Sequence, residues 1–158
     1  MDHLAKVRAF HARAVEPHLG KPRGCTEAQV RRLEKRVGFE LPGAYRQYLL
    51  FMGADREGVF QGSDWFLDDV AASTDLVPDL LAQNHVAHRL PEHYLAFFSH
   101  QGYMAAWFAL PKEGEDPRVF HFNEADEAGV VRTTAHFTRF LLDEMRGLSD
   151  GLADDGGA

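Results

Sequence analysis

The chain has 158 residues, of which 45% are hydrophobic and 26% are charged, and this balance predicts one globular domain rather than a disordered chain. Its formal net charge of −7 is spread unevenly: residues 1–38 hold nine Lys or Arg against four Asp or Glu, whereas residues 39–158 hold eight against twenty. An acidic body argues against nucleic acid as a ligand, because phosphates require a clustered positive face, and the absence of an apolar run of about 18 residues argues against a membrane span.

The first predicted helix covers residues 2–16. Asp2 is expected to be its N-cap, because a carboxylate accepts hydrogen bonds from the free N–H groups of the first turn. Pro17 is expected to end it, and the Gly- and Pro-containing stretch that follows predicts a loop. Its apolar stripe at helical spacing consists of Leu4, Val7, Phe10, His11 and Ala14.

The next two predicted helices are joined by a short turn. Thr26 followed by Gln29 forms a capping-box pattern, and Gly38 supplies the left-handed residue that ends the second helix. Pro42 stands near the start of the third helix, where a missing N–H is tolerated. The apolar positions of the pair are Val30, Leu33, Val37, Tyr45, Tyr48, Leu49 and Met52.

Shorter elements follow in the middle of the chain. They are predicted at residues 58–62 (a strand), at 65–73 (a helical turn or short helix), and from Pro78 toward Val86 (a helix). The clearest strand patterns are residues 94–98 and 103–110, which flank a Gly-containing turn. These two segments predict a β-hairpin.

The last part of the chain predicts two more strands and a helix. Residues 118–123 read as a third strand and 130–131 as a short fourth one. A final helix is expected from Thr133 or Thr134 to Leu148, with an apolar face of Phe137, Phe140, Leu141, Met145 and Leu148. The Gly- and Asp-rich residues 149–158 predict a flexible acidic tail.

The order of the elements predicts an α+β fold, because helices come first, strands follow and a helix ends the chain. We expect a single domain with a central antiparallel sheet, on which the N-terminal helices and the C-terminal helix pack. The domain is expected to cover residues 1–148, with 1–24 as an additional helix and loop, and the tail is 149–158.

The N-terminus and the cysteine content predict where the protein resides. The start Met1-Asp2-His3-Leu4 lacks the basic-then-apolar pattern of a secretory signal, so we expect a cytoplasmic protein. The single cysteine, Cys25, cannot form an internal disulfide bond. This agrees with a reducing compartment.

The segment LEKRVGFELPGAYRQYLLFMG, residues 33–53, resembles the start of the SUKH superfamily. The matching positions are Glu34, Gly38, Leu41-Pro42, Tyr45, Leu49 and Gly53. Later features also look like the family, namely the hairpin with Gly102 at its turn, the strand at 118–122 and Thr134-Ala135-His136-Phe137 at the start of the last helix. The similarity covers roughly residues 26–147. It departs at Met52-Gly53, where the family often has Asn-Gly, and in the loosely matching residues 65–91.

The resemblance implies a compact α+β domain with helices packed on a central sheet and no catalytic motif. Bacterial members of the superfamily are largely immunity proteins of polymorphic toxin systems, including toxins delivered between cells. Its fungal members look like cell-wall-synthesis regulators that act as interaction hubs. The resemblance therefore implies a protein-binding role and not an enzyme.

Four groups of residues in the sequence are candidates for chemistry. His85 and His88, spaced to share a helical face near His93, are either metal ligands or surface residues. Cys25, next to an expected helix start, is either a nucleophile or an inert thiol. The carboxylates Asp68-Asp69 and Glu113/Glu115/Asp116 are either acid–base pairs or solvated surface groups. The basic strip Arg31/Arg32/Lys35/Arg36 is either a phosphate contact or a polar helix face. We expect no catalytic residue, metal or cofactor.

The function expected from the sequence is that of an immunity protein that binds and neutralises a cognate toxin, with no nucleic acid or membrane as partner. An acidic face suits a basic toxin such as a nuclease; the alternative is that the acidic excess only maintains solubility. The acidic loops 113–116 and 124–127 are expected to converge on one edge of the sheet. Candidate contacts are the acidic residues Asp64, Asp68, Asp69, Glu113, Glu115, Asp116, Glu124, Asp126 and Glu127 and the aromatic anchors Trp65 and Tyr103, either of which can instead be core. A regulatory scaffold and a small metal- or thiol-dependent enzyme are the rival hypotheses.

Overall fold

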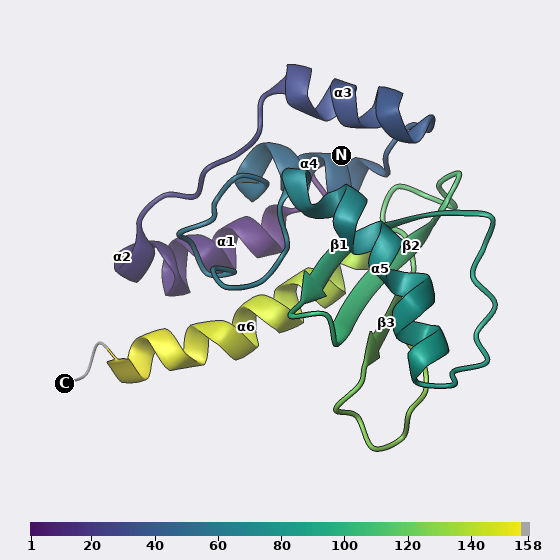
Figure 1. Ribbon diagram of the computed structural model, residues 1–158. Helices are drawn as coiled ribbons and strands as arrows, with labels where there is room; N and C mark the ends of the chain where they lie inside the picture. The colour runs from purple at the N-terminus through teal and green to yellow at the C-terminus, as the bar shows by residue number, and fades with distance from the viewer. Residues whose placement is uncertain (156–158) are drawn as a thin grey trace.

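The computed structural model describes residues 1–155 (Figure 1). The helices of this part are α1 (Ala5–Ala14), α2 (Glu16–Leu19), α3 (Glu27–Val37), α4 (Gly43–Met52), the 3-10 turn η1 (Leu67–Asp69), α5 (Val70–Gln83) and α6 (Phe137–Asp155). The strands are β1 (His93–His100), β2 (Met104–Leu110), β3 (Val119–Asn123) and β4 (Arg132–Thr134). No helix in this part of the chain is both long and apolar enough to cross a membrane.

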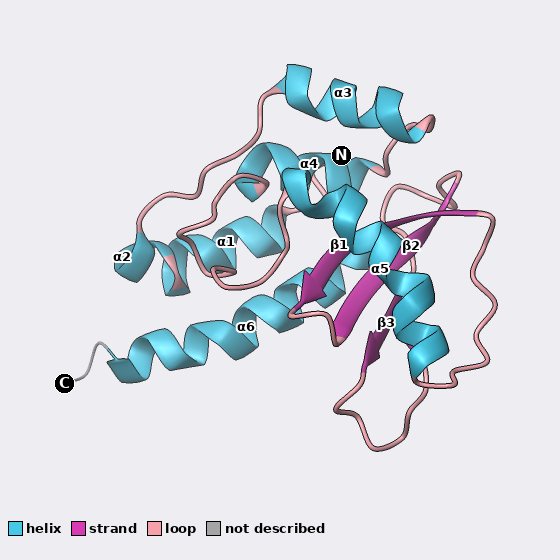
Figure 2. Ribbon diagram, in the orientation of Figure 1, coloured by secondary structure: helices cyan, strands magenta, loops and turns pink. Residues whose placement is uncertain are grey.

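The strands form one antiparallel sheet in the order β1-β2-β3-β4 (Figure 2). Side chains alternate between the two faces of a strand, and in β2 both sets are buried: Phe108 contributes to one core, and Trp107 contributes to the other. A sheet that is apolar on both faces must be covered on both. The predicted hairpin is confirmed, with Gly102 in its turn at φ 78°.

Helices cover both faces of the sheet, so the domain has three layers. On one face α5 packs against β1 and β2 through Val77, Leu80 and Leu81, and Figure 1 shows it crossing in front of the sheet. The opposite face packs against the N-terminal helices and α6, where Tyr45 meets Phe137 edge to face with a ring-centroid distance of 5.6 Å. The predicted α+β fold with helices on a central antiparallel sheet is therefore confirmed.

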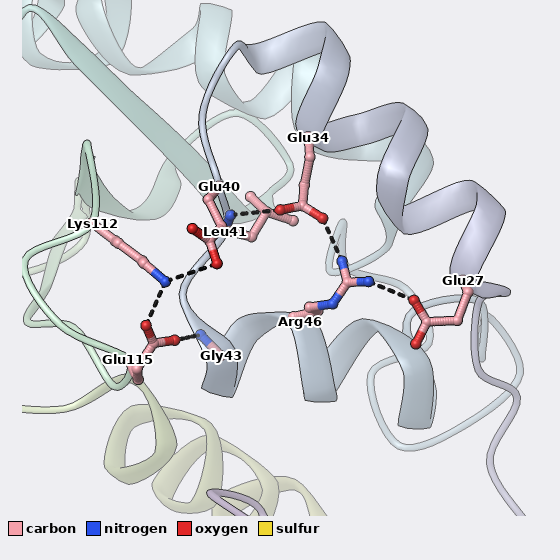
Figure 3. A network of polar contacts seen from close by, with 8 residues as sticks. All are labelled: Glu27, Glu34, Glu40, Leu41, Gly43, Arg46, Lys112 and Glu115. Atoms are coloured by element: carbon pink, nitrogen blue, oxygen red, sulfur yellow. Dashed lines mark hydrogen bonds and ion pairs between the residues drawn. The ribbon is translucent and has the colours of Figure 1, made fainter. Parts of the chain in front are cut away.

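The α3–α4 joint follows the sequence prediction closely. Thr26 and Gln29 form the capping box at the start of α3, and Gly38 ends that helix in the left-handed conformation. The carboxylate of Glu34 accepts a hydrogen bond from the Leu41 backbone N–H at 3.1 Å and also bonds Arg46 (Figure 3). Glu34, Gly38 and Leu41, three of the positions that carry the resemblance, thus hold the turn together.

The first predicted helix is interrupted. α1 ends at Ala14, and Pro17 lies in the first turn of the short helix α2 and does not end a helix. Proline fits there because the first N–H groups of a helix have no intrahelical partner. Asp2 is not the N-cap of α1, a position held by Leu4, although its carboxylate accepts the Leu4 N–H at 3.0 Å.

The middle of the chain contains two wrong predictions. Residues 58–62 are turns and not a strand, because the Gln61 N–H bonds the Gly58 carbonyl at 3.1 Å within the segment; Phe60 is buried by stacking on Trp65 at a ring-centroid distance of 4.2 Å. Pro78 lies inside α5 and does not begin a helix. Its missing N–H leaves the carbonyl of Thr74 without a helical donor, and the Tyr94 hydroxyl donates to that carbonyl at 3.0 Å.

The C-terminal boundaries also differ from the prediction. The fourth strand is β4 rather than residues 130–131, and α6 therefore begins at Phe137 and not at Thr133 or Thr134. α6 continues through the buried Ser149 to Asp155, beyond the expected end at Leu148. Of the predicted tail, residues 156–158 lie outside the described part of the chain.

Candidate interaction surface

The two predicted acidic loops lie at opposite ends of the sheet. In an antiparallel meander the β2–β3 connection leaves from one end, and the β1–β2 and β3–β4 connections leave from the other. The loop that contains residues 113–116 therefore cannot meet the loop that contains 124–127. The expectation that both converge on one edge is wrong.

Two carboxylates of the β2–β3 loop are engaged within the protein (Figure 3). Glu115 accepts the Gly43 N–H at 2.6 Å and bonds Lys112, and the Lys112 ammonium lowers the pKa of Glu115. Asp116 caps α6, because it accepts the Thr138 N–H at 2.9 Å and also the Thr138 hydroxyl. Glu113 is exposed and has no ion-pair partner among residues 1–155. This loop mainly connects elements.

The opposite end of the sheet gathers Asp64, Tyr103 and the loop after β3. Asp64 pairs with Ser99 at the end of β1, and the Glu124 N–H donates to the carbonyl of the half-buried Tyr103 at 2.9 Å. Asp126 pairs with Arg132, whose hydrogen bond lowers the pKa of Asp126. Glu124 and Glu127 are exposed and form no ion pair among the described residues. These two carboxylates remain accessible to a partner.

Trp65 belongs to the core. Its side chain is 1% exposed, and its backbone carbonyl accepts a hydrogen bond from the Tyr48 hydroxyl at 2.6 Å. The ring contacts Phe98 and Phe140 in addition to Phe60. Of the two readings that the sequence leaves open for Trp65, the structure therefore favours core packing over a surface anchor.

The exposed side of α5 carries acidic residues without partners. Asp75 and Asp79 stand one helical turn apart and are exposed, and Asp68 is exposed in the turn η1 that leads into the helix. None of the three forms an ion pair within residues 1–155, whereas Asp69 pairs with Arg56 at 3.0 Å. We call Asp68, Asp75 and Asp79 the acidic face of α5.

Sequence reasoning missed two members of this face. Asp75 and Asp79 were not among the predicted contacts, although the pattern that marks them is visible in the sequence. Residues 57–88 contain six Asp or Glu and no Lys or Arg. A segment of that composition contains no Lys or Arg that could pair with its own carboxylates. These carboxylates therefore stay unpaired unless another element supplies a cationic side chain.

The alternative chemical sites are not supported by geometry. His85 lies beyond the end of α5 with φ 56°, and His88 packs near Trp107 and Phe120, so the two histidines share no helical face. Within the described residues no three His, Cys, Asp or Glu side chains are grouped as metal ligands. Cys25 is buried, and burial raises the pKa of its thiol to about 11, which keeps it protonated near neutral pH.

The basic strip occupies a different helix. Arg31, Arg32, Lys35 and Arg36 are exposed on α3 and form no ion pair among residues 1–155. α3 packs on α4, while α5 packs on the sheet. Arg32 and Arg36 line one pocket together with Asp68, so the basic strip adjoins the η1 end of the acidic face, whereas Asp75 and Asp79 lie farther along α5.

Comparison with known proteins adds one finding. A family model described as SMI1 / KNR4 family (SUKH-1) matches residues 24–143. This range covers most of the chain, from the segment before α3 to the first half of α6, and leaves α1 and α2 outside. No curated protein sequence matches the chain.

Proposed function

The chain belongs to the SMI1/KNR4 (SUKH-1) family, and from that premise we propose that it is a non-enzymatic immunity protein that binds and neutralises a protein toxin. The mechanism is stoichiometric: the domain covers the active surface of the toxin or holds the toxin in an inactive state. Because no turnover is needed, the requirements are a rigid scaffold and a complementary surface. The three-layered core provides the first of these.

The acidic face of α5 is the observation that carries this proposal. Three exposed carboxylates that form no ion pair among residues 1–155, Asp68, Asp75 and Asp79, are available to pair with Lys or Arg on another protein. Opposite charge raises the rate of association and orients the partner, and its effect on the rate falls with salt. A basic toxin, such as a nuclease that binds phosphates, has the complementary surface.

A regulatory scaffold is the second candidate, and the family resemblance supports it because fungal members look like interaction hubs. Such a scaffold binds several partners weakly and needs no toxin gene beside it. An immunity protein binds one partner tightly. Affinity and the number of partners therefore separate the two hypotheses.

Co-expression tests the immunity proposal directly. The variable C-terminal domain of a modular protein encoded next to this chain is expressed alone and together with it. We expect growth to be restored only when both are present, and the two proteins to purify as an equimolar complex. If growth is not restored and no complex forms, the immunity proposal fails for that pair.

Charge variants test the surface. Asp75→Lys and Asp79→Lys are expected to weaken the complex, with most of the change in the association rate at low salt. The matched control is Glu113→Lys, an exposed carboxylate in the β2–β3 loop that also lacks an ion pair among the described residues. Equal weakening by the control and the α5 variants would show that net charge, rather than this face, governs binding.

A further inference from the structure

A cleft lies between the N-terminal helix α1 and the first half of α6. Figure 1 shows the two helices running beside each other, and they pack together. The cleft has a volume of about 520 Å³, within the range of pockets that hold small molecules. α1 lies outside residues 24–143, so one wall of this cleft is built by a helix that the family match does not include.

The walls of the cleft are predominantly cationic. Lys6 comes from α1, and Arg139 and Arg146 come from α6. Lys6 forms no ion pair among residues 1–155. Arg139 and Arg146 come from the acidic part of the chain, residues 39–158, which holds only eight Lys or Arg against twenty Asp or Glu.

Nearby carboxylates neutralise the walls only partly. Asp143 lies 2.9 Å from the Arg139 guanidinium and 3.9 Å from that of Arg146, so two cations share one anion. Asp2 lines the cleft, but its carboxylate accepts the Leu4 N–H and lies 3.6 Å from the guanidinium of Arg8. The cleft therefore retains an excess of positive charge.

The lining also includes apolar side chains. Val7 from α1 and Leu142 from α6 form the floor but are only 1% and 7% exposed, so the apolar surface open to a ligand comes from the exposed Ala5 and the aliphatic stems of Lys6 and Arg139. Apolar lining beneath cationic groups suits a ligand with two parts: an anionic end and an apolar or aromatic body. A nucleic-acid strand does not fit this description, because it needs a longer continuous positive surface.

We propose that this cleft binds a small phosphorylated molecule of about nucleotide size. The guanidinium groups of Arg139 and Arg146 bind phosphate oxygens through their planar pairs of N–H donors, and Lys6 supplies a point charge from the opposite wall. The apolar body of the ligand rests on Ala5 and the aliphatic stems of Lys6 and Arg139. This site is distinct from the acidic face of α5 and does not depend on the proposed immunity function.

The experiment titrates the ¹⁵N-labelled full chain with ATP in the absence of divalent cations and follows backbone amide shifts. We expect saturable shifts concentrated in α1 and the first half of α6. Lys6→Gln and Arg139→Gln are each expected to weaken binding roughly tenfold, as measured by calorimetry. Lys35→Gln on α3 removes the same charge from an exposed position and is expected to leave binding unchanged. A melting curve for each variant confirms that it is folded.

Two further ligands test whether the cationic walls bind the phosphates and the apolar lining binds the rest of the ligand. Pyrophosphate lacks the apolar body and adenosine lacks the phosphates, and both are expected to bind more weakly than ATP. Adenosine binding as tightly as ATP would overturn the role of the cationic walls. Absence of saturable shifts, shifts centred on α3, or equal effects of Lys6→Gln and Lys35→Gln would overturn the site itself.

Discussion

The hydroxyl of Tyr94 donates a hydrogen bond to the backbone carbonyl of Thr74 at 3.0 Å, the carbonyl that Pro78 leaves without a donor inside α5. The Thr74 hydroxyl in turn accepts the Ala96 N–H at 3.0 Å. A proline in a helix normally weakens it, because an i to i−4 bond is lost. Here the strand β1 supplies the replacement, which binds α5 to the sheet.

This relationship predicts a coupled pair of variants. Tyr94→Phe removes the donor and should lower the free energy of unfolding by about 1 kcal/mol. Pro78→Ala restores an N–H at the position that faces the Thr74 carbonyl, so in that background Tyr94→Phe should be milder. Chemical denaturation of the four proteins in a double-mutant cycle measures this coupling. If the changes in unfolding free energy of the two variants simply add, the Tyr94 hydroxyl and the N–H restored at position 78 do not share the Thr74 carbonyl.

The prediction that Pro78 begins a helix was wrong, and it shows which features can be predicted from the sequence and which cannot. Features governed by neighbours in sequence were predicted correctly, including the Thr26 capping box and the turn at Gly38, because the interacting groups lie within a few residues. The partner of Thr74 lies twenty residues away in β1. No local pattern reveals it.

The same distinction applies to the start of α6 and to the candidate surface. Thr133 and Thr134 look like local caps, but the cap is Asp116, which lies 22 residues before Thr138. The acidic loops also look equivalent in sequence, and only the strand order sends them to opposite ends of the sheet. By contrast, the charge asymmetry of residues 57–88 was available from sequence.

Glu34 should contribute more to stability than Glu27, although both bond Arg46. The Glu34 side chain is 20% exposed and also accepts the Leu41 N–H, whereas the Glu27 side chain is 53% exposed. Glu34→Ala leaves a part-buried N–H without its acceptor and should cost about 2 kcal/mol of unfolding free energy. Glu27→Ala should cost about 0.5 kcal/mol or less, because exposed ion pairs are weak. Urea denaturation compares the two, and equal losses would contradict this assignment.

Trp65 provides a test of core packing against surface contact. Trp65→Ala should lower the unfolding free energy by about 3–5 kcal/mol, because the ring is enclosed by Phe60, Phe98 and Phe140. Tyr103→Ala, at a half-buried position in the β1–β2 turn, should lower it by less. Thermal unfolding measures both. A Trp65→Ala protein as stable as the parent would place the ring outside the core.

Stability should fall as the pH drops below about 6.5, the ordinary histidine pKa. His11 is 1% exposed, and burial lowers its pKa despite the opposing charges of Asp55 and Glu16. The unfolded chain therefore binds a proton more readily than the folded chain below that pH, which favours unfolding. Burial and Arg132 lower the pKa of His121 and add in the same direction.

Comparison with His11→Leu isolates the contribution of this residue. Between pH 7.5 and 5.5 the unfolding free energy of the His11→Leu variant should decline less steeply than that of the parent. The two slopes should differ by at most about 1.4 kcal/mol per pH unit. Burial raises the pKa of Asp55, which acts in the opposite direction as the pH falls. Identical slopes for the two proteins would contradict a neutral buried His11.

The acidic face of α5 should carry a small cost in stability. Asp75 and Asp79 repel each other across one helical turn with no described cation nearby, and such like-charge pairs destabilise a helix by about 0.2–0.5 kcal/mol. Asp79→Asn should therefore raise the unfolding free energy by a few tenths of a kcal/mol. Under the proposed function it should also weaken the proposed complex with a toxin, since a surface retained for binding is not optimised for stability. Denaturation and calorimetry on the same preparations measure both effects. A gain in stability without loss of affinity would remove Asp79 from the interface and leave its charge to solubility alone.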